Sequence, residues 1–165
     1  MKAWLRGLTM VSRETEQQRR AYYWRQVDHA GSRDAKRALG VLDRVAQQHA
    51  VVELYHRHLT AIVLIETLER PLWIRVAEWA ARICGRTRTT CGPLQLRGAP
   101  FATAKAYRLG ALQLDAMAHE LKRALTSGDV AAYWHGSAAR QTGASISYEE
   151  AIEIAAAAVS ARPPS

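Results

Sequence analysis

The sequence predicts a mainly α-helical protein with one small irregular or β-hairpin region. Several stretches repeat apolar residues at a spacing of three and four, which is typical of amphipathic helices. Most of the ten Gly and five Pro residues lie after residue 84, so irregular backbone is expected mainly in the second half. A chain of 165 residues, 48% of them apolar, can bury the core of one domain.

Four helices are expected before residue 84. A polar helix runs from Glu14 to Val27 and ends before Gly31-Ser32, where Ser32 suits the N-cap of a second helix from Asp34 to about Gln48. A third helix runs from about Ala50 to Leu68. Pro71 ends it and suits the first turn of a fourth. The fourth helix carries an apolar stripe formed by Trp73, Val76, Ala77, Ala80 and Ile83.

The second half begins with an irregular segment from Gly85 to Pro100, which is the place for a short β-hairpin. A long helix follows from Phe101 to about Leu125. Ser127-Gly128-Asp129 ends it and caps a short helix through Tyr133. The last helix is capped by Ser147, with Glu150 in the capping-box position. We expect residues 1–45 to form an N-terminal helical arm packed on a domain of residues 46–165.

The chain is strongly basic, with a formal charge of +8 and a pI of about 10. Such a charge indicates an anionic partner, for which nucleic acid, a membrane surface and bacterial cell wall all qualify. Arg82, Arg86, Arg88 and Arg97 flank the irregular segment with no acidic residue between them, which fits either a solvated loop or an anion-facing rim. No run is long and apolar enough to span a membrane, and the first residues are too weakly apolar for an evident signal peptide.

Two cysteines, Cys84 and Cys91, bracket a turn-like stretch. They can form a disulfide if the chain doubles back there, or they can remain two free thiols. The sequence has no C-x-x-C motif.

Glu66 stands at the end of the apolar run Ala61–Ile65. A carboxyl at the mouth of an apolar helix can stay protonated near neutral pH, because burial disfavours its charged form. The alternatives are that Glu66 faces water or pairs with Arg70 at i+4. Glu69 is the rival acid, but the apolar residues directly before Glu66 favour Glu66 as the acid.

Three motifs in order give this chain a family resemblance. They are Glu66-Thr67 at the end of the apolar run, then Gly92–Leu96 followed by Pro100–Ala104, and finally Ala132–Gly136. The chain resembles the lysozyme-like superfamily, and within it the lytic transglycosylases and goose-type lysozymes, over about residues 55–160. Those enzymes carry apolar residues before E-S, then G-L-M-Q-L with P-x-T-A, and then A-Y-N-x-G. Here Thr67 replaces the serine, Trp134 replaces the asparagine, and additional residues precede Pro100.

The resemblance implies that residues 46–165 form a lysozyme-like catalytic domain that cleaves the MurNAc–GlcNAc bond of peptidoglycan. Glu66 would be the single acid/base, Gln95 and Tyr133 would hold the sugar, and Thr89 and Thr90 would line the site. In the lytic transglycosylase reaction one glutamate serves as acid and then as base, and the 6-hydroxyl or N-acetyl group of the substrate completes the reaction. A hydrolytic lysozyme is the close variant, with a water held by Thr89 or Thr90. Neither cofactor nor metal is implied.

The resemblance also implies a setting and partners. The substrate is the peptidoglycan glycan strand, so the protein is expected in the periplasm or cell wall. Because no signal peptide is evident, we expect export by a specialised route, or a leader absent from this chain. A secretion machine or an immunity protein would then be a further partner. We expect neither nucleic-acid binding nor a membrane span.

Other charged residues give weaker indications. Glu78, Asp115, Glu120 and Asp129 are expected on solvated faces or in caps, which leaves no second catalytic carboxylate. His49, Glu53 and His56 share one helix face at i, i+4 and i+7, but no further metal ligand is evident. Asp115 and His119 are expected to make an exposed i, i+4 contact. The rival function is a non-enzymatic basic helical protein that binds nucleic acid or an acidic partner.

Overall fold

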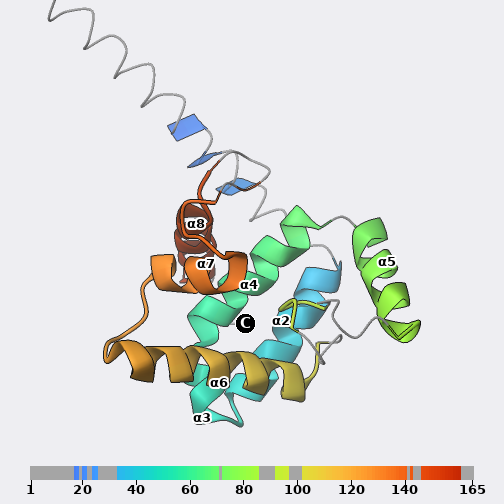
Figure 1. The fold of residues 1–165 in the computed structure, drawn as a ribbon, viewed down its shortest axis with the longest axis horizontal. Helices are drawn as coiled ribbons and strands as arrows, with labels where there is room; N and C mark the ends of the chain where they lie inside the picture. Colours follow the sequence, from blue (N-terminus) through green and yellow to red (C-terminus); the bar gives the residue numbers. More distant parts are fainter. Residues whose placement is uncertain are drawn as a thin grey trace, which may run out of the picture.

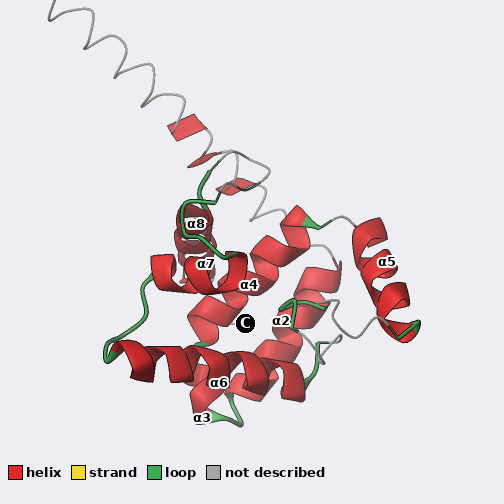
Figure 2. Cartoon of the chain, in the orientation of Figure 1, coloured by secondary structure: helices red, strands yellow, loops and turns green. Residues whose placement is uncertain are grey.

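The computed structural model describes residues 17–18, 20–21, 24–25, 33–70, 72–85, 92–96, 102–140, 142 and 146–160. Within this part of the chain the expectation of a mainly α protein is confirmed, and no strand is present (Figure 2). The helices shown in Figure 1 are α2 (Arg33–Ala46), α3 (Ala50–Leu54), α4 (His56–Glu69), α5 (Leu72–Ile83), α6 (Ala104–Leu121), α7 (Ser127–His135) and α8 (Tyr148–Ser160).

Helix α4 lies at the centre of the molecule and packs against α8 and α2, with α7 packed on α8 (Figure 1). Every side chain from Leu59 to Ile65 is at most 2% exposed. A helix with this much apolar surface on all sides is stable only when other helices surround it. The unbroken apolar run in the sequence is therefore the central helix of the core, and Glu66 is the first charged residue beyond it.

Helix α2 belongs to the same core, since Leu42 and Val45 are buried in one cluster with residues of α4. The hydroxyl of Tyr107 donates a 2.7 Å hydrogen bond from α6 to the carbonyl oxygen of Ala38 in α2. The boundary expected between residues 45 and 46 thus falls inside a core helix. Of the remaining arm, the described Arg20 lies 3.8 Å from Glu150 of α8, between its Nε and the carboxylate.

The structure defines three helix ends that can be compared with the predicted ones. The helix predicted from Ala50 to Leu68 is two helices, because Tyr55 leaves helical geometry and ends α3 before α4 begins. Thr126, rather than the predicted Ser127-Gly128-Asp129 stretch, is the N-cap of α7 and forms a capping box with Asp129. The capping box predicted at Ser147 is confirmed, because Ser147 and Glu150 exchange hydrogen bonds between backbone N–H and side chain, both 3.2 Å long.

Helix α5 turns its apolar stripe to the outside. Trp73 is 71% exposed, Val76 53% and Ile83 63%. The other side of the helix carries Glu78, whose side chain is only 15% exposed. The amphipathic pattern predicted from sequence is therefore present, but its polar side faces the end of α4.

The irregular segment is described only at Gly85 and at Gly92–Leu96, where the chain forms a turn. The predicted β-hairpin between Gly85 and Pro100 rests largely on residues outside the described ones. Thr89, Thr90 and Cys91 also lie outside the described residues. Cys84 is described and is an exposed free thiol.

Candidate active site

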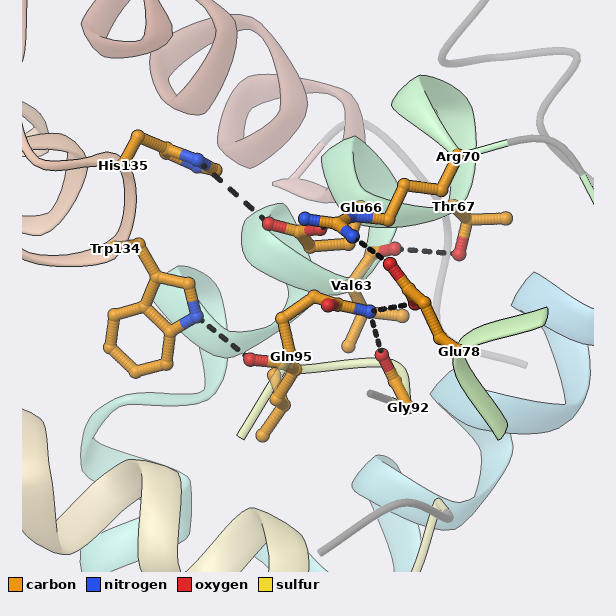
Figure 3. A network of polar contacts seen from close by, with 10 residues as sticks. Val63, Glu66, Thr67, Arg70, Glu78, Gly92, Gln95, Trp134 and His135 are labelled. Atoms are coloured by element: carbon orange, nitrogen blue, oxygen red, sulfur yellow. Dashed lines mark hydrogen bonds and ion pairs between the residues drawn. The ribbon is translucent and has the colours of Figure 1, made fainter. Parts of the chain in front are cut away.

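Glu66 occupies the last buried position of α4 and is 6% exposed (Figure 3). Thr67 faces the helix itself, and its hydroxyl donates to the carbonyl oxygen of Val63 at 2.7 Å. Burial of a carboxyl disfavours the charged form. A group at this position must therefore be neutral, or must have a cation beside it.

Arg70, one turn after Glu66, supplies that cation. Its Nε donates to Oε2 of Glu66 at 2.8 Å. The predicted burial of Glu66 and its predicted pairing with Arg70 thus occur together, and the alternative that Glu66 faces water is wrong. Burial raises the pKa of Glu66 above its ordinary value, although Arg70 opposes the shift; the charges of Glu78 and Glu69 raise the pKa further.

Glu78 of α5 joins the same network, which contradicts its expected place on a solvated face. Its Oε1 accepts from Nη1 of Arg70, and its Oε2 accepts from Nε2 of Gln95 at 3.2 Å. Arg70 thus binds two carboxylates from two helices. A second carboxylate therefore lies in the network around Glu66, at a residue that the sequence had placed on a solvated face.

Gln95 enters the network from the Gly92–Leu96 turn. Its backbone φ of 51° lies in the left-handed region, and its Nε2 also donates to the carbonyl oxygen of Gly92 at 3.0 Å. The neighbouring Leu94 is 1% exposed and anchors the turn in the core. A Cβ on Gly110 of α6 would lie 2.9 Å from Cδ1 of Leu94, so the glycine makes room for this anchor.

Trp134 fixes the other side of the turn. Its Nε1 donates to the carbonyl oxygen of Leu94 at 2.9 Å, and its ring packs partly buried against the core. Trp134 stands where the resembled motif has asparagine. In this structure the residue ties α7 to the turn that carries Gln95 (Figure 3).

His135 approaches Glu66 from α7 and was not singled out from the sequence. Its Nδ1 lies 3.8 Å from Oε1 of Glu66, and its ring stacks on Tyr148 with centroids 3.5 Å apart. Burial lowers the pKa of His135 to about 4, with Arg140 and Arg70 adding to the effect, so the ring is neutral at pH 7. The available signal was its position directly after Tyr133-Trp134 in the third motif.

Tyr133 lies on a different side of α7. It is 50% exposed and lines a groove of about 530 Å³ together with α6 residues that include Gln113 and Met117. The structure thus brings Gln95 and His135 to the Glu66 network and places Tyr133 in this separate groove. Thr89 and Thr90 lie outside the described residues.

No protein-family model, curated protein or solved structure matches this chain. The residues and their geometry are therefore the basis for its proposed function.

The other charged constellations are structural contacts. No group of three or more His, Cys, Asp or Glu side chains in the described part of the chain could hold a metal ion. His56 instead lies 2.7 Å from Asp43, between Nε2 and Oδ1. Asp115 lies 3.6 Å from His119, as expected, and also accepts from Tyr55 at 3.2 Å. Asp129 pairs with Arg123 at the start of α7.

Replacing His135 by glutamine is expected to weaken the acid sensitivity of the fold. The folded pKa of His135 is about 4 and its ordinary value is 6.5. Its contribution to stability is therefore complete above pH 6.5 and is lost as the pH falls toward 4. Urea unfolding at pH 7, 5.5 and 4.5 should show a smaller loss of stability for His135→Gln than for wild type. Equal losses in both proteins would contradict this assignment.

Proposed function

We propose that this chain is a peptidoglycan-cleaving muramidase with a lysozyme-like helical fold, acting as a lytic transglycosylase on the MurNAc–GlcNAc bond. The observation that carries the proposal is Glu66, a buried carboxyl whose pKa is raised at the end of the central helix. A general acid must hold its proton at the working pH, and desolvation is how proteins arrange this. The order of the three sequence motifs supplies the substrate class.

The reaction assigned to Glu66 balances without water. Glu66 gives its proton to the oxygen that leaves C1 of MurNAc, and the C1–O bond breaks. The carboxylate then takes the proton of the MurNAc 6-hydroxyl as that oxygen bonds to C1. Arg70, 2.8 Å from Oε2, would stabilise the carboxylate that exists between these steps. The products are a 1,6-anhydro-muramyl end and a free GlcNAc hydroxyl.

Gln95 and Tyr133 have different parts in this proposal. Gln95 binds Glu78 and the Gly92 carbonyl, which supports a role in positioning the site beside Glu66. Tyr133 would bind a sugar only in the groove between α6 and α7. Thr89 and Thr90 are kept as proposed lining residues on the resemblance alone.

A hydrolytic lysozyme is the second candidate, and Glu78 is the observation that favours it. Many glycosidases use two carboxylates, the second of which activates water or attacks the sugar. Both oxygens of Glu78, however, already accept hydrogen bonds from Arg70 and Gln95. These contacts engage both oxygens of Glu78 within the protein, so transglycosylation remains the first proposal.

Digestion of purified peptidoglycan, followed by mass analysis of the fragments, tests the proposal. We expect 1,6-anhydro-muramyl ends, because the tethered 6-hydroxyl has the entropic advantage of an intramolecular nucleophile. Reducing MurNAc ends would instead identify a hydrolase, and Glu78→Gln should then lose most of the activity. Intact peptidoglycan, combined with a shift of a DNA fragment at moderate salt, would favour the nucleic-acid-binding rival.

Because peptidoglycan is the proposed substrate, the protein would act in the periplasm or cell wall. The charge of +8 would draw the protein to the anionic wall polymer. A secretion machine or an immunity protein is the partner that such an exported enzyme would have. No helix among the described residues is long and apolar enough to cross a membrane.

A further inference from the structure

The outer side of α5 is an exposed apolar face. Trp73 and Ile83, near the two ends of the helix, are 71% and 63% exposed, while Val76 and Trp79 between them are 53% and 43% exposed. The helix lies at the edge of the described part of the molecule (Figure 1). It takes no part in the main helix–helix packing of that part. Large aromatic side chains gathered in this way mark a binding surface.

The only acidic residue of α5 is turned away from this face. Glu78 is 15% exposed and pairs with Arg70 at the end of α4. The outer side of the helix therefore presents aromatic and aliphatic groups without a carboxylate. Arg75 and Arg82 are half-buried on the same helix and add positive charge near its two ends.

The sequence that follows Glu78 contains no acidic residue until Asp115. From residue 79 to residue 114 there is no Asp or Glu, while the basic residues are Arg82, Arg86, Arg88, Arg97, Lys105 and Arg108. An anionic surface would find no like charge in this stretch. A second copy of the chain would instead carry the same net charge of +8, which is unfavourable.

We propose that α5 binds an anionic lipid surface, lying in the plane of the interface with Trp73, Val76, Trp79 and Ile83 inserted. Tryptophan is preferred at membrane–water interfaces because its ring is amphipathic. Helices that combine such a face with basic residues bind anionic lipids without spanning the bilayer. Because Glu78 lies on the opposite side, α5 can be bound to lipid while Glu78 keeps its contact with Arg70.

Sedimentation with lipid vesicles tests this inference on the full chain. Phosphatidylcholine vesicles are compared with vesicles that also contain phosphatidylglycerol, at low and high salt. We expect binding to the phosphatidylglycerol vesicles only, weakened by salt, with a blue shift of the tryptophan fluorescence. The variant Trp73→Ser/Ile83→Ser should bind the vesicles at least about tenfold more weakly, because two inserted side chains are lost.

Leu112→Ser is the matched control, since Leu112 is 52% exposed on α6. This control should bind like wild type. The inference is overturned if both vesicle types bind equally, if neither binds, or if the α5 variant binds like the control. It is also overturned if the chain is a dimer that the α5 variant converts to a monomer, because a second copy then covers the face. Glu66→Gln should bind vesicles normally, so failure of the proposed reaction would leave this result unaffected.

Discussion

Glu66→Gln is expected to lower peptidoglycan cleavage by roughly 100- to 10,000-fold, the range that general acid catalysis contributes. Glutamine keeps the shape of the side chain, and its amide oxygen can still accept from Nε of Arg70, where the wild-type distance is 2.8 Å. The dissociable proton is lost. Release of soluble fragments from purified peptidoglycan measures the effect, and thermal unfolding measures the fold.

The matched control is Glu69→Gln, on the same helix and half-buried. It removes a carboxyl of the same kind from the rival position and should leave cleavage close to wild type. Wild-type cleavage by Glu66→Gln would refute the assignment of the acid. A large drop in the melting temperature of Glu66→Gln would show that the residue acts mainly in folding.

Arg70→Met is expected to destabilise the fold by about 3 kcal/mol at pH 7, the size found when one partner of a buried ion pair is removed. Methionine preserves most of the apolar volume of the side chain but leaves Glu66 and Glu78 facing each other without their shared cation. Both carboxylates are largely buried, with side chains 7% and 15% exposed. Urea unfolding of both proteins gives the difference in free energy.

The pH dependence separates this effect from simple loss of packing. A raised folded pKa means that Glu66 favours folding in its protonated form, and this contribution is lost as the pH rises through the folded value. Without Arg70 the folded pKa of Glu66 should be higher still, so the destabilisation should shrink as the pH falls. The double variant Arg70→Met/Glu66→Gln should recover part of the stability at pH 7. A deficit that is the same at every pH would contradict the shared-cation interpretation.

The helices and the burial of Glu66 could be predicted because their signals are local. The run Ala61–Ile65 indicated a buried helix, and the structure buries each of these residues to 1% exposure or less. Ser147 and Glu150 could be recognised as a capping box because both partners lie within one turn. The break at Tyr55 was missed, since helical spacing of apolar residues continues across it and nothing in the residue type marks a stop.

The partners of Glu66 could be predicted only in part. Arg70 was foreseen as an alternative because it lies at i+4, which is contact distance on any helix. Glu78 and His135 were not assigned to the site, since they reach Glu66 only through the placement of α5 and α7. Tyr133 illustrates the same difficulty, because His135, two residues later, approaches Glu66 while Tyr133 itself lines another groove.

The sequence by itself determined the helical class, the buried run that ends at Glu66, and the amphipathic character of residues 72–83. Only the tertiary structure decided which side of α5 is buried and which carboxylates share Arg70. Periodicity states which residues lie on one face of a helix, because 3.6 residues make a turn in every α-helix. Periodicity does not show which part of the protein, or whether solvent, that face contacts. In α5 the pairing of Glu78 with Arg70 accompanies the burial of the polar side and leaves the two tryptophans outside.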